Sequence, residues 1–285
     1  MRITVLLLFI FFATSLPAQI STNGNEKNIC GEILKKSQSE NLNQLPINEV
    51  AAKIAKQFIG TNYEAGTLDQ NEKEELVVHL SGLDCYTLVD NSIAFARAIK
   101  SGTPDYETFI SELEKVRYRN GKLNGYISRL HYVTDWIYDL QKRGILKDIT
   151  KEIGGEKFKK TINFMSENSE KYAHLINNAD NVAKIKVVEN GINSRDYYFV
   201  SQEKIADVET NINDGDIIAL TTGIKGLDIV HVGFAVKGND NRIHFLHAPN
   251  VGFKVQITEK TLADYVQGIK SQTGIMVFRV LEPGN

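Results

Sequence analysis

The pattern of hydrophobic positions divides the chain into a helical first part and a β-rich second part. Between residues 46 and 59, apolar side chains recur at helical spacing, and Gly60 follows as a stop signal. Apolar spacing of the same kind predicts further helices over 85–100, 104–116, 128–141 and 157–176. From Asp214 onward, turn residues separate short runs rich in β-branched and aromatic residues. These runs predict strands over 216–221, 229–236, 242–247, 253–257 and 275–280.

The order of these elements predicts the fold class. Helices followed by a meander of strands indicate an α+β fold with a C-terminal antiparallel sheet or half-barrel. We expect the helical part at about 44–182, with one short strand at 76–80, and the β-rich part at about 195–281. A chain of this length has enough residues to bury a substantial core. We therefore expect a single domain over residues 20–285.

Residues 1–19 have the pattern of a signal peptide. A minimal charged start at Met1-Arg2 precedes an apolar stretch over 5–13 and a cleavage-like segment at 15–19. The apolar stretch is too short to span a bilayer, and no later segment is continuously apolar for long enough. The sequence therefore predicts an exported, soluble protein without stable membrane insertion.

The charge balance gives no reason to expect a nucleic-acid partner. The formal net charge is −2 and the isoelectric point is about 6.3. Lysine-rich stretches such as 151–160 also contain acidic residues, as expected of solvated helix faces. Without a basic patch or stripe, binding to nucleic acid is not expected.

Cys85 is the candidate nucleophile. It follows Leu83-Asp84 and begins the helix predicted over 85–100. A thiol at a helix N-terminus lies at the positive end of the helix dipole, which lowers its pKa and provides an oxyanion site. The alternative is a disulfide with Cys30, the second of the two cysteines. Cys30 lies close to the mature N-terminus, a poor anchor for a structural bridge, so we favour the nucleophile.

Two histidines on neighbouring predicted strands are candidates for a base and its partner. On the first strand, His231 alternates with a row of apolar core residues, and its own face also carries Gly233 and Ala235. If residue 239 is the centre of the following turn, His231 pairs directly opposite His247. The Cβ atoms of such partners are about 4.5–5.5 Å apart. Together with Cys85, the pair would supply a nucleophile, a base and a group that orients the base.

A zinc site is the alternative use of these histidines. His231, His244 and His247 would be its ligands. However, His244 faces away from His247 on an ideal strand, and no carboxylate completes an obvious ligand set. We therefore expect no metal and no cofactor. The remaining histidines are interpreted as structural: His79, His131 and His174.

Four segments of the chain resemble, in order, the NlpC-type papain-like cell-wall cysteine peptidases: 60–63, 83–85, 231–234 and 245–248. The resemblance implies a papain-like core. It also implies that Cys85 is the nucleophile, His231 the base and His247 the polar residue that orients the base. Tyr63 is similar to the tyrosine that lies near the thiol in that superfamily.

One branch of that superfamily is a closer match. The segment from Asp84 to Asp90 resembles the Cys-x-Thr-Phe-Val-Glu motif of the N-acetylmuramoyl-L-alanine amidase-like branch, with Asp90 in place of the glutamate. Residues 128–136, 164–166 and 247–250 also resemble it, and the match extends from about 50 to 281. The resemblance implies cleavage of the amide between the lactyl group of N-acetylmuramic acid and L-alanine. Its implied substrates are GlcNAc–1,6-anhydro-MurNAc-peptides, fragments handled in cell-wall recycling, which suggests a periplasmic location.

Residues 129–136 are the candidate segment for further substrate contacts. Arg129 would pair with a carboxylate or glycan oxygens, and Tyr132 or Trp136 would stack on a sugar. The alternative is that Trp136 belongs to the buried apolar stripe of the helix. The spacing of Arg129 and His131 places them outside that stripe. The expected substrate-binding residues are Tyr63, Asp84, Arg129, His131 and Tyr132.

Two other functions remain open at this point. A γ-D-glutamyl–diaminopimelate endopeptidase would use the same groups to cut within the stem peptide. A non-catalytic protein that binds wall fragments belongs to another class, and the presence of Cys85, His231 and His247 argues against it.

Overall fold

The computed structural model describes residues 19–22 and 24–284. The predicted signal peptide, apart from its last residue, lies outside the described residues. Within the described part of the chain, no helix is both long and apolar enough to cross a membrane.

An antiparallel sheet forms the centre of the fold, as the sequence predicts. Its strands follow the order β11-β10-β9-β8-β12-β7-β6, and β5 pairs with β12 beside β7. All six residues of β8 are buried, because helices cover both faces of the sheet. The strands are β5 (Leu146–Asp148), β6 (Glu156–Lys157), β7 (Tyr198–Ser201), β8 (Ile217–Thr222), β9 (Ile229–Lys237), β10 (Ile243–His247), β11 (Gln256–Ile257) and β12 (Gln272–Val280).

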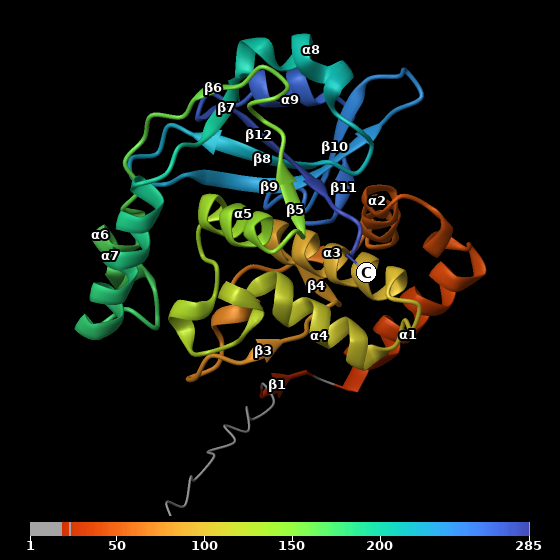
Figure 1. The fold of residues 1–285 in the computed structure, drawn as a ribbon, viewed down its shortest axis with the longest axis horizontal. Helices are drawn as coiled ribbons and strands as arrows, with labels where there is room; N and C mark the ends of the chain where they lie inside the picture. The colour runs from red at the N-terminus through yellow and green to blue at the C-terminus, as the bar shows by residue number, and fades with distance from the viewer. Residues whose placement is uncertain (1–18, 23, 285) are drawn as a thin grey trace, which may run out of the picture.

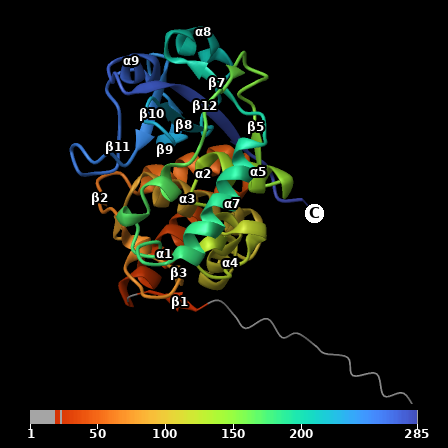
Figure 2. The same ribbon diagram turned by 90° about the vertical axis from the view of Figure 1, so that its left-hand side faces the viewer.

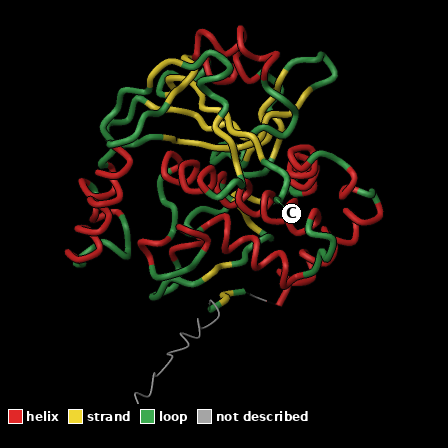
Figure 3. Tube along the Cα trace, viewed as in Figure 1, coloured by secondary structure: helices red, strands yellow, loops and turns green. Residues whose placement is uncertain are grey.

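The helices lie in two layers and one lateral group (Figures 1 and 2). One face of the sheet packs on α2 (Ile47–Gln57), α3 (Cys85–Lys100) and α5 (Val133–Lys142), with α1 (Gly24–Ser39) and α4 (Tyr106–Arg117) beyond them. The other face is covered by α8 (Ile205–Val208) and α9 (Leu262–Gln267). To one side lie α6 (Phe164–Glu167) and α7 (Ala179–Asn193). Figure 3 shows the strands of the large sheet gathered in one half, with most helices and the remaining short strands in the other.

The helix α3 is buried on nearly all sides between α2, α4 and β9. It begins at Cys85 because Asp84 caps it. The Asp84 carboxylate accepts a hydrogen bond from the Thr87 N–H at 2.8 Å, and the Thr87 hydroxyl accepts one from the Asp84 N–H at 2.9 Å. This reciprocal capping box satisfies two backbone donors that the first turn leaves unpaired. The cap therefore defines where the first residue of the helix stands.

Two short parallel strand pairs lead the chain into α3. The strand β1 (Ile20–Ser21) pairs with β3 (Leu76–Val77), so the strand predicted over 76–80 is only two residues long. The second pair joins β2 (Asn62–Tyr63) to β4 (Gly82–Leu83), which ends directly before Asp84. This second pair brings Tyr63 beside Leu83, close to the start of α3.

The β9–β10 hairpin corrects the predicted pairing of the two histidines. Leu246 pairs with Phe234, so the register places His247 opposite Gly233 and not opposite His231. The turn is centred on residue 240, one residue later than expected, because the Gly238 N–H donates to the Arg242 carbonyl. Moving the centre of the turn by one residue changes the cross-strand partner of each residue by two positions. A shift of two keeps both histidines on one face, since side chains alternate with a period of two.

The helix predicted over 157–176 is wrong. That segment contains one residue of β6, the single turn of α6 and a 3-10 turn at Ser169–Lys171. The Phe158 N–H bonds to the Tyr197 carbonyl, so tertiary pairing replaces helical hydrogen bonds there. The longer helices α1 and α7 were not predicted, and neither were the short helices α8 and α9. In α7 the buried side chains are only Ile185, Glu189 and Ile192, which is too narrow an apolar stripe to stand out in the sequence.

Candidate active site

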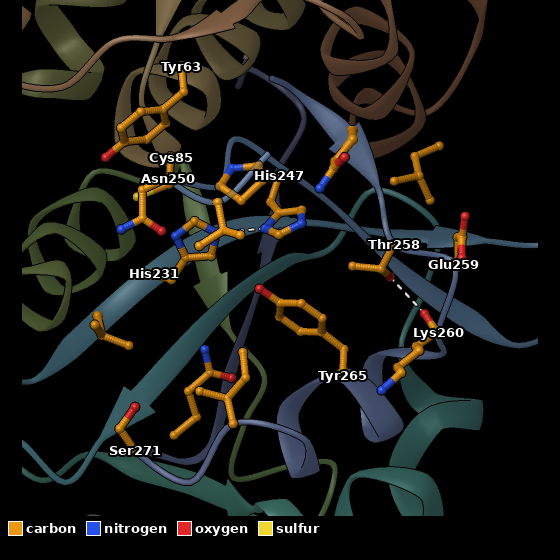
Figure 4. Close-up of a pocket in the computed structure, with 17 residues that line it drawn as sticks. Tyr63, Cys85, His231, His247, Asn250, Thr258, Glu259, Lys260, Tyr265 and Ser271 are labelled. Carbon is orange, nitrogen blue, oxygen red and sulfur yellow. Dashed lines mark hydrogen bonds between the residues drawn. The ribbon is translucent and has the colours of Figure 1, made fainter. Parts of the chain in front are cut away.

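Cys85, His231 and His247 line one cavity of about 750 Å³ (Figure 4). Cys85 is the first residue of α3, His231 lies near the start of β9, and His247 ends β10. Tyr63 lines the same cavity from β2. Residues that are far apart in the sequence therefore meet here, as the sequence predicts for these four.

The two imidazole rings are joined by a hydrogen bond. Nε2 of His231 lies 2.7 Å from Nδ1 of His247, and the ring planes are nearly perpendicular, at 83°. Gly233 makes this contact possible, because a Cβ at that position would lie only 3.0 Å from the Cβ of His247. The absence of a side chain there lets the His247 ring reach across to the neighbouring strand.

This hydrogen bond determines the tautomers that catalysis would require. For His231 to accept a proton at Nδ1, its Nε2 must carry the hydrogen and donate it to Nδ1 of His247. His247 then carries its own hydrogen on Nε2. That atom is buried and has no hydrogen-bond partner among the described residues. In this tautomer Nδ1 of His231 is free to accept a proton, while the other ring nitrogen is hydrogen-bonded to His247.

A bulge in β9 helps to place His231. Leu220 of β8 pairs with His231, whereas the next residue, Thr221, pairs with Ile229. Val230 is therefore the extra residue, and its side chain is turned out to the cavity. Bulges bend a strand locally and redirect its side chains. No feature of the sequence had indicated this one.

Burial dominates the acid–base properties of the three groups. Burial, followed by the nearby Asp84 carboxylate, raises the pKa of the Cys85 thiol to about 12. Hydrogen bonds from backbone N–H groups, that of Val232 first, oppose this rise without cancelling it. Burial also lowers the pKa of His231 to about 4. Burial and the proximity of His231 lower the pKa of His247 to about 3.

These shifts correct the expectation that the helix N-terminus lowers the thiol pKa. Desolvation of the thiolate outweighs the helix dipole, so burial favours the neutral forms of the thiol and of both imidazoles. Tyr63 is also neutral, because burial and the Cys85 and Asp84 charges raise its pKa. Its hydroxyl is therefore a hydrogen-bond donor at neutral pH.

Four of the five predicted substrate-binding residues do not line the cavity. Arg129 is buried and pairs with Asp69 and Glu74. Tyr132 is buried, and its hydroxyl donates to Glu189 at 2.8 Å. Neither lines the cavity, because both side chains are used to join loops of the helical part.

His131 and Asp84 are likewise occupied. The Nε2 atom of His131 lies 2.9 Å from the Tyr126 carbonyl, and the ring packs on the Tyr126 ring. The Asp84 carboxylate caps α3 and does not line the cavity. Trp136 is buried and donates to the Val116 carbonyl, so it belongs to the core stripe.

Asp90, at the position where the resembled motif has a glutamate, forms a buried ion pair with Arg117. The Asp90 carboxylate accepts a hydrogen bond from Nε of Arg117 at 2.7 Å, and both side chains are buried. Arg117 also donates to the Val77 carbonyl. The pair ties α3 to α4 and to the strand β3, inside the helical part and away from the cavity.

The disulfide and zinc alternatives do not match the geometry. Both cysteines are free, and Cys30 is buried on α1 in the core. His244 turns away from the histidine pair: its Nδ1 lies 2.9 Å from the Thr258 carbonyl, and its Nε2 lies 3.2 Å from the Asp240 carboxylate. It is thus not available as a ligand beside His231 and His247.

Sequence reasoning missed one side of the cavity. Tyr265 on α9 and Gln272 at the start of β12 both line it. The Tyr265 side chain points toward the histidine pair, as Figure 4 shows, and Oε1 of Gln272 is buried without a partner among the described residues. Tyr265 could have been suspected only if α9, a helix of six residues, had been predicted.

Several solved structures of other proteins are similar to this chain. A crystal structure of an N-acetylmuramoyl-L-alanine amidase from Bacteroides uniformis is 33% identical, with a TM-score of 0.78, and the match covers 82% of this chain and 99% of that one. A Bacteroides fragilis protein, provisionally assigned as a xylanase, is 34% identical, with a TM-score of 0.76 and coverage of 81% and 100%. A Legionella pneumophila protein at 23% identity, with a TM-score of 0.69 and coverage of 90% and 95%, shares the fold.

No curated protein matches the chain. The sequence model of the N-acetylmuramoyl-L-alanine amidase-like family matches residues 53–275, which is most of the chain and includes Cys85, His231 and His247. The matched range contains the whole of α3 and the β9–β10 hairpin. The chain therefore belongs to the N-acetylmuramoyl-L-alanine amidase-like family.

Proposed function

We propose that this protein is a cysteine amidase that hydrolyses the amide between the lactyl group of N-acetylmuramic acid and L-alanine in peptidoglycan fragments. The observation that carries the proposal is the convergence of Cys85, His231 and His247 on one cavity, with the two imidazoles hydrogen-bonded at 2.7 Å. A nucleophile, a base and a group that orients the base are the parts that acyl transfer needs. We assign them to one catalytic domain over residues 20–285.

The reaction would proceed through a thioester. His231 takes the Cys85 proton at Nδ1 as the sulfur attacks the lactyl carbonyl carbon, which forms a tetrahedral oxyanion. When the C–N bond breaks, His231 gives the proton to the alanine nitrogen, and the peptide leaves. Water then attacks the thioester while His231 accepts its proton, and the collapse of the second intermediate releases the lactyl carboxylic acid and restores the thiol.

The neutral resting forms of Cys85 and His231 determine the step at which the thiol proton is transferred. The pKa of the Cys85 thiol is about 12 and that of His231 about 4, so an ion pair is disfavoured before substrate binds. Proton transfer would therefore accompany attack on the carbonyl. His247 would stabilise the transient His231 imidazolium by accepting its Nε2 hydrogen.

Two donors would stabilise the oxyanion. The backbone N–H of Cys85 lies in the first turn of α3, where such groups lack helical partners. The Tyr63 hydroxyl is protonated and lines the same cavity. Loss of one oxyanion donor typically lowers turnover by about 10²–10³-fold. We therefore assign Tyr63 to the oxyanion site and to substrate contact.

The substrate would be a GlcNAc–1,6-anhydro-MurNAc-peptide, processed outside the cytoplasm without metal or cofactor. The cavity has the volume of an ordinary ligand pocket, and its lining mixes polar and apolar side chains. Glycoside hydrolysis, the activity named for the Bacteroides fragilis protein, requires two facing carboxylates. Among the described residues, Glu259 is the only carboxylate that lines this cavity. The lining therefore favours amide cleavage over glycoside cleavage.

A digest followed by mass spectrometry tests the proposal. The mature protein and its Cys85→Ala variant would each be incubated with an anhydro-disaccharide–tetrapeptide and its non-anhydro counterpart. Free tetrapeptide plus intact disaccharide, absent with the variant, is the expected result. A disaccharide–dipeptide product would instead mean the γ-D-glutamyl–diaminopimelate endopeptidase. Binding without cleavage by both proteins would mean a non-catalytic wall-fragment binder.

A further inference from the structure

An apolar tip stands beside the candidate active site. It consists of Val251, Gly252 and Phe253, in the loop between β10 and β11, and we call these three residues the rim. The side chains of Val251 and Phe253 are 78% and 67% exposed, although both are large and hydrophobic. Val251 lines the cavity itself, so the rim is continuous with the site.

The backbone of the rim is held in an unusual conformation. Phe253 has φ of +55°, and the preceding Gly252 has φ of +91°. A positive φ is rare for a bulky residue, because its Cβ then approaches the following carbonyl oxygen. The conformation turns the Phe253 ring out to solvent, where it buries little apolar surface. Neither the backbone nor the hydrophobic effect within this chain accounts for a phenylalanine at this position.

Hydrogen bonds connect the rim to the segment that carries Tyr63. The Phe253 carbonyl accepts the Tyr63 N–H at 2.7 Å, and Val255 exchanges backbone hydrogen bonds with Gly60 and Thr61, each 2.9 Å long. Through the β2–β4 pair, the same segment lies beside Leu83, two residues before Cys85. The backbone of Phe253 is thus fixed beside the segment that carries Tyr63, two residues from Val251, which lines the cavity.

We propose that the rim binds a sugar ring of the substrate, with the Phe253 ring packed against the apolar C–H face of the pyranose. The inference rests on the proposed function, since it takes the occupant to be the glycan half of a wall fragment. A pyranose is uncharged and has one face of C–H groups, which suits an exposed aromatic ring. The stem peptide, by contrast, carries carboxylates.

The charges around the cavity assign the two halves of the substrate to opposite sides. Glu259 and Lys260 are the charged acid and base that line it, and Figure 4 places both beyond His247, away from Cys85 and Asn250. Asn250 directly precedes the rim. The charged stem peptide therefore extends toward Lys260, and the neutral glycan lies over the rim. Tyr132 and Trp136, the aromatic residues expected to stack on sugar, are buried elsewhere.

The Phe253→Gly variant removes the aromatic ring and keeps a residue that can adopt the positive φ at this position. Glycine adopts positive φ readily, so this variant should fold at least as stably as the wild type. Its KM for the anhydro-disaccharide–tetrapeptide should rise about fivefold to tenfold, with kcat within about twofold. Phe253→Trp should restore KM. Val187→Ala is the matched control, because Val187 is 70% exposed on α7 and should leave both constants unchanged.

A second measurement keeps this inference separate from the proposed function. Titration calorimetry of the Cys85→Ala protein with the free anhydro-disaccharide should show binding that Phe253→Gly in the same background weakens. That result would stand even if the wild type cleaved a different bond. Equal disaccharide affinity with and without the Phe253 ring would overturn the inference. So would a dimer of the wild type that Phe253→Gly dissociates in light scattering, because a second copy of the chain would then be the occupant.

Discussion

Gly233 lies opposite His247 in the β9–β10 pair, and the missing side chain at that position provides the space in which His247 reaches His231. An added Cβ at Gly233 would lie 2.4 Å from the Leu246 carbonyl oxygen and 2.7 Å from the Phe245 ring. The contact between His231, the candidate base, and His247 therefore depends on a residue that has no side chain.

Gly233→Ala should move β10 and break the histidine pair. Overpacking of this kind typically costs about 1–3 kcal/mol of the free energy of unfolding. We expect activity to fall by more than the stability loss explains, when both are measured well below the melting temperature. Gly223→Ala is the control, since its nearest neighbour would be 3.9 Å away. Full activity in Gly233→Ala would contradict the role given to the His231–His247 contact.

The cap at Asp84 should affect catalysis as well as stability. Asp84→Ala removes the carboxylate that accepts the Thr87 N–H, a change worth about 1 kcal/mol at a helix N-cap. Because Cys85 is the next residue, the start of α3 should fray and turnover should fall. Asp105 caps α4 through Thr108 in the same manner, away from the cavity. Asp105→Ala should therefore cost similar stability in urea unfolding and leave turnover intact.

Alkylation of Cys85 should report the neutral resting pair. The pKa of the thiol is raised to about 12. At any pH below that value, the thiolate fraction therefore increases about tenfold for each unit by which the pH rises. The rate of reaction with iodoacetamide should then rise steadily from pH 6 to pH 9. Cys85→Ala supplies the background from the buried Cys30, whose pKa burial also raises to about 12. A rate that levels off below pH 7 would indicate a preformed thiolate–imidazolium pair instead.

Removing one partner of the buried Asp90–Arg117 pair should be costly. Asp90→Ala leaves a buried guanidinium without its carboxylate, which typically costs about 3–5 kcal/mol. The exposed Lys147–Glu152 pair offers the comparison, because Glu152→Ala should change stability by less than about 1 kcal/mol. Both values come from chemical denaturation at neutral pH. Similar costs for the two variants would mean that Arg117 finds another partner.

The parts of the fold that follow from local pattern were predictable. The strands from β8 to β10 and the helix α3 have strong apolar patterns with clear ends, and the structure has them close to the predicted ranges. The helices α1 and α7 were missed, because helices with weakly apolar faces form only when the rest of the protein packs on them. The segment 157–176 failed for the opposite reason, since tertiary pairing to Tyr197 displaced a plausible helix.

The same distinction between local pattern and tertiary contacts applies to the residues of the candidate site. Cys85, His231 and His247 could be placed together from a helix start and from strand periodicity, and this survived a two-residue error in register because the error preserved the face. Arg129 and Tyr132 were misplaced as substrate contacts, because the sequence does not show that Asp69 pairs with Arg129 and that the buried Glu189 accepts the Tyr132 hydroxyl. The bulge at Val230 and the rim depend on backbone geometry that no residue pattern indicates.

The burial of α3 on nearly all sides has a consequence for how this site can change over time. Substitutions along that helix disturb α2, α4 and β9 together, so Cys85 is mounted on a part of the chain that tolerates little variation. Residues 250–254 of the loop between β10 and β11 are exposed by comparison, and their side chains can be exchanged without repacking the interior. Divergence among relatives should therefore retain the chemistry and alter the fragment that is chosen. A laboratory selection for new wall fragments should accumulate its first substitutions at residues 250–254.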